Sequence, residues 1–178
     1  MMQYEPAGAR DKSLLFFLAK ENVERYEDLH AVRLAPALVQ IRDKIEAHIE
    51  EYTAIWQGKT KVGYFYLHRD GDGWEWEDFY LFPEYRGQGI GTQVLRERLP
   101  GQADPVFSYV FLRNTRAIAL YRRFGFKVTQ TLRGSLHRMD RPAIRILSDM
   151  PASRTAGQEE AFEPALHLCR QREYTGKV

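Results

Sequence analysis

Cysteine is nearly absent from this sequence, in which Cys169 stands alone among 178 residues. A single cysteine excludes a disulfide within the chain and any zinc site built from clustered cysteines. The five histidines are scattered without the spacing of metal ligands, so no metal is expected. Because unpaired thiols are typical of reducing compartments, we expect a cytoplasmic protein.

Long apolar runs and a strong charge of one sign are missing as well. No stretch approaches the roughly 20 apolar residues that a membrane-spanning helix needs, so no membrane association is expected. The first residues, 1–6, lack the charged-then-apolar pattern of a secretory signal. The formal net charge of +2 is too small and too dispersed to indicate a nucleic-acid partner.

Apolar residues are nevertheless abundant enough for a folded core. A hydrophobic content of 44% with 13% aromatic residues excludes global disorder, and the length suits one domain. We expect this domain over residues 1–141 and a C-terminal extension over 142–178, in which Pro164 interrupts a helical pattern. The role of the extension is left open, as is the choice between monomer and homodimer.

The most informative stretch is the glycine-rich segment Arg86-Gly87-Gln88-Gly89-Ile90-Gly91. It follows an apolar, strand-like run at 79–82 and precedes a helix-like run at 92–96. Glycines allow a ligand to approach the backbone, and the first N–H groups of a helix have no intrahelical partners. The order strand, glycine turn, helix therefore predicts a phosphate-bearing ligand here, with an ordinary connecting turn as the alternative.

Two better-known phosphate-binding patterns do not fit. The dinucleotide fingerprint has its third glycine three residues after the second, whereas Gly91 follows Gly89 by two. A triphosphate-binding loop ending at 58–60 requires a glycine five residues before Gly58, where Thr53 stands. A nucleotide-binding protein of another class is therefore disfavoured, and Gly58 is expected in a hairpin turn.

A second strand–turn–helix unit follows closely. Residues 107–112 are rich in aromatic and aliphatic side chains, as in a strand, and Asn114 stands at the end of that run. The apolar residues Ala117, Leu120, Tyr121 and Phe124 then recur at helical spacing, and Gly125 is a natural helix terminator.

Together the two units resemble the signatures of the GNAT superfamily of acyl-CoA-dependent N-acetyltransferases. Arg86-x-x-Gly89-x-Gly91 is similar to the family's diphosphate-binding motif R/Q-x-x-G-x-G/A. The second motif of the family is similar to Val110-x-x-x-Asn114-x-x-Ala117-x-x-Leu120-Tyr121-x-x-x-Gly125-Phe126. The resemblance covers residues 50–140 well, the N-terminal part loosely and the last 35 or so residues not at all.

The remaining pattern predicts an α+β fold. Helices are expected over 12–24, with Leu14, Leu15, Phe17, Leu18 and Val23 on a buried face, and over 34–51. Strands are expected at 2–7, 52–56, 61–67 and 74–82, with a last hairpin formed by 126–133 and 135–141 around Gly134. The resemblance implies a mixed, mostly antiparallel sheet of six to seven strands, with helices on both faces and splayed fourth and fifth strands.

The resemblance also implies acetyl-CoA as the acyl donor, held without a metal. Its diphosphate would lie on the turn at 87–92 and its pantetheine arm along the fourth strand. The donor-binding residues implied are Leu81, Phe82, Arg86, Gly87, Gln88, Gly89, Ile90, Gly91, Thr92, Asn114 and Tyr121. For Arg86 a surface role is the alternative, and Asn114 also suits a helix N-cap.

Catalytic groups are expected on two elements. Tyr121 resembles the family's general acid, which protonates the departing thiolate, although a core tyrosine is the alternative. Glu75 and Glu77 fall two residues apart on one face of the fourth strand and are the candidate bases, if burial raises their pKa. Solvated carboxylates on a half-exposed strand are the alternative. Asp78 is expected on the opposite face, and His68 is interpreted as a strand-end residue.

The function implied is transfer of an acetyl group to a primary amine of a small molecule or peptide, by direct attack in a ternary complex. The alternative is a non-catalytic acyl-CoA sensor or structural module on the same fold. Such a module needs the glycine turn but neither Tyr121 nor the two glutamates.

Overall fold

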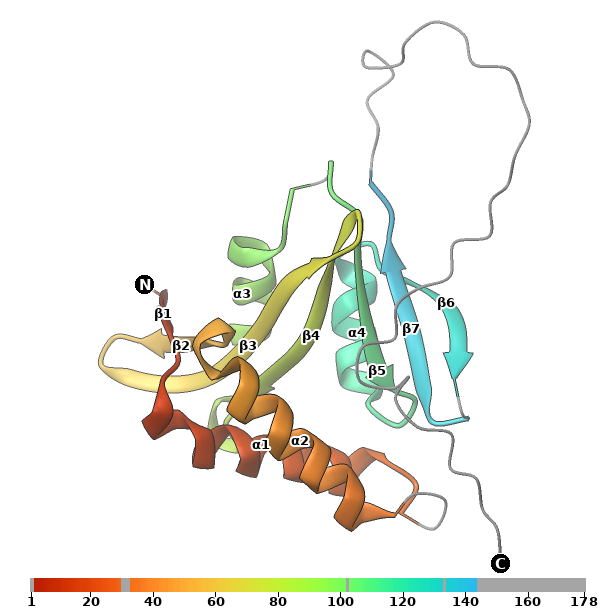
Figure 1. Cartoon of the computed structure of the whole chain (residues 1–178). Helices are drawn as coiled ribbons and strands as arrows, with labels where there is room; N and C mark the ends of the chain where they lie inside the picture. The colour runs from red at the N-terminus through yellow and green to blue at the C-terminus, as the bar shows by residue number, and fades with distance from the viewer. Residues whose placement is uncertain (1, 30–32, 102, 133, 144–178) are drawn as a thin grey trace, which may run out of the picture. The chain divides into compact units, whose positions relative to one another are not determined.

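The computed structural model describes residues 2–29, 33–101, 103–132 and 134–143, and within them seven strands form one mixed sheet (Figure 1). The strand order is β1-β2-β3-β4-β5-β7-β6, and only the β4–β5 pair is parallel. The strands are β1 Met2–Pro6, β2 Thr53–Gln57, β3 Thr60–Asp70, β4 Gly73–Leu81, β5 Val106–Phe111, β6 Lys127–Leu132 and β7 Leu136–Arg141. The expected extension falls outside the described residues from residue 144 onward.

Helices cover both faces of the sheet, as expected. One hydrophobic cluster joins α1 and α2 to Tyr52, Tyr64 and Tyr66, and a second joins α3 and α4 to Phe65 and Trp76 (Figure 1). The helices are α1 Lys12–Tyr26, α2 Leu34–His48, α3 Ile90–Arg98 and α4 Thr115–Arg123, with short 3-10 turns at Ala9–Asp11, Ile49–Glu51 and Pro83–Tyr85. None of the described helices combines the length and apolar character needed to cross a bilayer.

The buried face of α1 is narrower than expected. Leu15 and Leu18 are fully buried, whereas Leu14 is 46% exposed and Phe17 is 56% exposed. Successive helical residues are rotated by about 100°, so Leu14 and Phe17 both lie beside the stripe that Leu15, Leu18 and Val23 follow. The expectation that all five residues are buried was therefore wrong for these two.

Strands β4 and β5 separate after a short contact. They pair only at Trp74 with Val106 and at Glu75 with Phe107, while β5 pairs with β7 along its whole length. Beyond Glu75, no strand of the described chain pairs with that edge of β4. The predicted splay of the fourth and fifth strands is confirmed.

A β-bulge interrupts the pairing of β3 with β4. Tyr66 lies opposite Asp78 and the next residue, Leu67, lies opposite Trp76, so Glu77 is the extra residue. An extra residue in one strand breaks the alternation of side chains between the two faces. As a result, Glu77 and Asp78 both point to the face that α2 covers, where Lys44 contacts both.

Candidate active site

The glycine-rich turn connects β4 to α3 through backbone conformations that favour glycine. Gly87 has a φ of 79° and Gly89 a φ of 82°, both in the left-handed region. A Cβ at Gly89 would meet no atom within 4 Å, so the space above this residue is open. Gly91 has another role, because a Cβ there would lie 3.1 Å from Leu120 Cδ2, where α3 and α4 approach each other closely.

Six consecutive backbone amides of this turn have no acceptor within the described part of the chain. The flanking Arg86 N–H donates to Pro83 O at 3.2 Å, and the Gln93 N–H donates to Gly89 O at 3.0 Å. Between them, none of the N–H groups at 87–92 donates to a described backbone or side-chain acceptor. Unpaired amides at a helix N-terminus carry partial positive charge and form a natural anion site.

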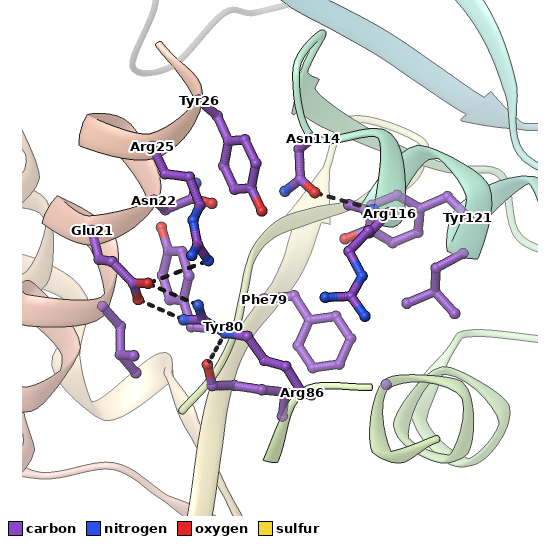
Figure 2. Close-up of a pocket in the computed structure, with 15 residues that line it drawn as sticks. Glu21, Asn22, Arg25, Tyr26, Phe79, Tyr80, Arg86, Asn114, Arg116 and Tyr121 are labelled. Atoms are coloured by element: carbon purple, nitrogen blue, oxygen red, sulfur yellow. Dashed lines mark hydrogen bonds and ion pairs between the residues drawn. The ribbon is translucent and has the colours of Figure 1, made fainter. Parts of the chain in front are cut away.

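A cavity of about 170 Å³ lies beside this turn (Figure 2). Its walls come from α1, from the end of β4, from the turn and from α4 with its N-cap. Five of the residues predicted to bind the donor line it, namely Leu81, Arg86, Gly91, Asn114 and Tyr121. The cavity therefore lies where β4 has left β5 and where the open amides begin.

Arg86 uses its guanidinium within the protein. Its Nε donates to Leu81 O at 2.8 Å, while Nη1 and Nη2 donate to the two carboxylate oxygens of Glu21 at 2.8 and 2.6 Å (Figure 2). The hydrogen bonds with Arg86 hold the pKa of Glu21 below its ordinary value. Arg86 thus fastens the turn to α1.

Asn114 and Tyr121 belong to α4 and face the cavity (Figure 2). Asn114 is the N-cap of the helix, and its Oδ1 accepts from the Ala117 N–H at 3.1 Å, which leaves the amide nitrogen Nδ2 available for a ligand. Tyr121 is only 5% exposed. Burial raises the pKa of its hydroxyl, partly offset by a hydrogen bond with Ser108, so Tyr121 stays protonated over the physiological range.

Lys44 of α2 joins two carboxylates of β4. Its Nζ lies 2.6 Å from Asp78 Oδ2 and 3.1 Å from Glu77 Oε1. Tyr52 and Tyr80 also donate to Asp78. Although burial alone raises the pKa of Asp78, Lys44 and the two tyrosines hold it below its ordinary value. The expectation that Asp78 lies on the face opposite to Glu77 was wrong, because the bulge turns both to one side.

His68 bridges the two candidate bases. Its Nε2 lies 3.1 Å from Glu77 Oε2 and 3.7 Å from Glu75 Oε2. Glu75 is only 7% exposed, and burial, together with the charge of Glu77, raises its pKa to about 8. Burial lowers the pKa of His68, but the hydrogen bond to Glu77 and the nearby carboxylates outweigh it and raise the value to about 9.

His68 lies near the end of β3, as expected, and it also contacts the two candidate bases. Its cross-strand position opposite Glu75 was accessible in the sequence through the hairpin at 70–73, which sets the register of the two strands. None of His68, Glu75 and Glu77 lines the cavity itself.

Two of the residues predicted to bind the donor use their polar groups elsewhere. The Phe82 N–H donates to Val62 O at 3.0 Å, and its ring packs edge-on against Tyr64, away from the cavity. The Gln88 side chain donates to Glu84 O at 2.5 Å, which leaves only its backbone N–H at the turn. Sequence reasoning also missed Arg116, which lines the cavity. Within the described residues, no group of three or more His, Cys, Asp or Glu side chains could hold a metal ion.

The chain resembles known acetyltransferases over its central part. Residues 48–128 match the family model described as an acetyltransferase (GNAT) domain. The chain is 32% identical over 83 residues to a mycothiol acetyltransferase of Corynebacterium efficiens, a match to 43% of this chain and 27% of that protein. It is 35% identical over 78 residues to a thialysine N-epsilon-acetyltransferase of Bos taurus, a match to 39% of this chain and 46% of that protein. The matches thus span less than half the length of either relative.

The fold is similar to that of solved acetyltransferases. The crystal structure of paiA N-acetyltransferase from Thermoplasma acidophilum, in complex with coenzyme A, superposes with a TM-score of 0.63 at 19% identity, covering 80% of this chain and 99% of that one. At this identity the likeness shows the fold, which agrees with the sheet order and with the separation of β4 from β5. Residues 48–128 of this chain thus match the GNAT acetyltransferase domain model, and the described chain has the fold of solved acetyltransferases.

Proposed function

We propose that this protein is an N-acetyltransferase that transfers the acetyl group of acetyl-CoA to a primary amine of a small molecule or peptide, by direct attack in a ternary complex. The observation that carries the proposal is the run of six unpaired amides at 87–92, which opens beside a cavity at the point where β4 leaves β5. This arrangement supplies a diphosphate site and an unpaired strand edge next to each other. The match of residues 48–128 to the GNAT acetyltransferase domain model supports the same activity.

Residues of three elements would hold the donor. The amides at 87–92 would bind the diphosphate, because they are unpaired and lie at the positive end of the α3 dipole. The unpaired edge of β4 beyond Glu75 would hydrogen-bond the pantetheine amides. Asn114 would add its free Nδ2 donors from the start of α4. The donor contributes an activated thioester, and the protein orients it.

The attacking amine must be neutral. A lysine-like amine has a pKa of about 10.4, so its deprotonation at pH 7 costs about 4.6 kcal/mol, whereas an α-amine with a pKa near 8 costs about 1.4 kcal/mol. Glu75, which belongs to the group formed by His68, Glu75 and Glu77, has a pKa of about 8, in the range that a base for this amine needs. Because these side chains do not line the cavity, we propose that a water molecule passes the proton to them.

Tyr121 would act on the leaving group. The amine nitrogen forms a bond to the acetyl carbon, the carbon–sulfur bond breaks, and the electron pair remains on sulfur. Tyr121 then supplies a proton to the thiolate, while the proton lost by the amine goes to the group formed by His68, Glu75 and Glu77. The reference pKa of a tyrosine hydroxyl, about 10, exceeds the thiol value of about 8.5, so complete proton transfer from Tyr121 is uphill. A hydrogen bond from Tyr121 that strengthens as charge develops on sulfur is sufficient.

Two measurements test the proposal in sequence. Acetyl-CoA at 100 times its Kd should stabilise the protein by about 2.7 kcal/mol, whereas ATP and NAD should leave the melting temperature unchanged. Release of the CoA thiol is then followed over a panel of small-molecule and peptide amines. Turnover with at least one amine supports the enzyme. Binding of acetyl-CoA without turnover over the whole panel would contradict the enzyme and favour the non-catalytic acyl-CoA-binding module.

A further inference from the structure

The cavity contains three arginines, and two of them are already paired. Arg86 forms the two-pronged ion pair with Glu21, and Arg25 Nη1 lies 3.5 Å from the same carboxylate. The Glu21 carboxylate compensates one of the two positive charges, and its bidentate contact is with Arg86. The donors of Arg86 are therefore engaged within the protein, although Arg86 occupies the position of the family's diphosphate motif.

The third arginine, Arg116, lies in the first turn of α4 and reaches across the glycine turn. Its Nη2 lies 3.4 Å from the position that a Cβ at Gly87 would occupy. Figure 2 shows its guanidinium extending into the cavity, with no interaction drawn to it. Within the described residues, no carboxylate or carbonyl pairs with Arg116, so its charge and all five of its N–H donors are available.

Arg113 and Arg122 differ from Arg116 in their position relative to the cavity. Arg113, three residues earlier, lies outside the cavity, where Nη1 donates to Glu27 O at 3.3 Å and Nη2 lies 3.8 Å from Asp28 Oδ2. Arg122, on the same helix, does not line the cavity either. Among the arginines of the described cavity wall, Arg116 thus combines an uncompensated charge with a position over the unpaired amides.

We infer that Arg116, and not Arg86, supplies the side-chain cation for the donor's diphosphate, and that Arg86 serves to position the turn against α1. This inference rests on the proposed function, because it assumes a donor with a diphosphate at 87–92. A guanidinium recognises two phosphate oxygens at once through its planar donors. Arg116 therefore distinguishes a nucleotide-bearing thioester from a truncated thioester that lacks phosphate.

The test compares Arg116→Gln with Arg122→Gln by calorimetric titration of three probes. CoA carries the diphosphate and a 3′-phosphate, dephospho-CoA keeps only the diphosphate, and pantetheine lacks both. Arg116→Gln should weaken the binding of CoA and of dephospho-CoA by roughly 10- to 100-fold and leave the affinity for pantetheine unchanged. Arg122→Gln should bind all three like the wild type.

Other outcomes would overturn the inference. If Arg116→Gln loses affinity for CoA alone, Arg116 binds the 3′-phosphate. A Kd of this variant for dephospho-CoA within twofold of the wild type would exclude a role of Arg116 at the diphosphate. Arg86→Gln and Glu21→Gln should weaken the binding of CoA by similar factors, with no further loss of affinity in the double variant, because both residues act through one ion pair. A loss of affinity with Arg86→Gln but not with Glu21→Gln would show that Arg86 binds the phosphate directly. Failure of the wild-type protein to bind CoA would instead refute the proposed function itself.

Discussion

His68 and Glu77 meet across the β3–β4 hairpin, with His68 Nε2 3.1 Å from Glu77 Oε2. Glu75 lies directly opposite His68 in the register, and Glu77, two residues further along β4, lies on the same side. His68 Nε2 also lies 3.7 Å from Glu75 Oε2, and the pKa is about 8 for Glu75 and about 9 for His68. The group formed by His68, Glu75 and Glu77 is the candidate base of the proposed reaction.

The first prediction concerns the pH dependence of turnover. A base acts in its deprotonated form, so kcat/KM should rise with pH and level off above about 8, where Glu75 has lost its proton. Glu75→Gln cannot titrate at this position and should lower kcat/KM by roughly 100-fold while removing the midpoint near 8. Glu24→Gln, which alters an exposed ion pair with Lys20, is the control. An unchanged midpoint in the Glu75 variant would contradict the assignment.

Tyr121 carries the second prediction. Tyr121→Phe removes the proton donor but keeps the ring in its buried place, so kcat should fall by roughly 100-fold and the Kd for acetyl-CoA should stay within twofold. Single-turnover kinetics and calorimetry measure the two quantities. Tyr4→Phe, which removes a hydroxyl bonded to Glu97 on the surface, should behave like the wild type. Equal turnover in both variants would retire Tyr121 as the acid.

The third prediction uses Gly89 to separate the effect of backbone strain on stability from the effect of an added side chain on ligand binding. Both Gly89 and Gly58 have a positive φ, and a Cβ at either would meet no atom within 4 Å. Alanine at either position should therefore lower the free energy of unfolding by a similar amount, about 1 kcal/mol. Only Gly89→Ala should weaken the binding of acetyl-CoA, because the added methyl group points into the open space above the unpaired amides. Equal affinity in the two variants would show that the donor binds elsewhere.

Lys44 is predicted to be a structural cation. Lys44→Met leaves Glu77 and the buried Asp78 without their counter-charge, so the free energy of unfolding should fall by about 3–5 kcal/mol. Adding Asp78→Asn should recover part of this loss, since one uncompensated charge is removed. Chemical denaturation of the single and double variants measures the coupling. Strictly additive effects would show that the two residues do not act as a pair.

Much of the fold could be predicted because its signals are local. The helical spacing in α4, the hairpin turn around Gly58 and the glycine turn after β4 each depend on a few neighbouring residues. The exposed Leu14 and Phe17 of α1 were predicted wrongly because apolar residues outnumber the positions that the sheet can cover. The residues of a helix predict that it has an apolar face, but the width of the buried part depends on what packs against the helix.

The site was harder to predict because its contacts depend on register and on distant partners. A strict alternation places Asp78 opposite to Glu77, and a bulge of one residue reverses this without a local sequence signal. Arg86 and Glu21 are 65 residues apart in the sequence, so no motif reveals that they form an ion pair. The motif predicted the position of the glycine turn between β4 and α3, whereas the partners of its side chains required the structure.

Residue-resolved amide hydrogen exchange, measured by NMR with and without CoA, tests the central claim most directly. If the backbone N–H groups at 87–92 hold the diphosphate, they should exchange rapidly in the free protein and become strongly protected when CoA is bound, while the amides around Gly58 do not change. Protection that arises elsewhere and leaves 87–92 exchanging as before would contradict the account.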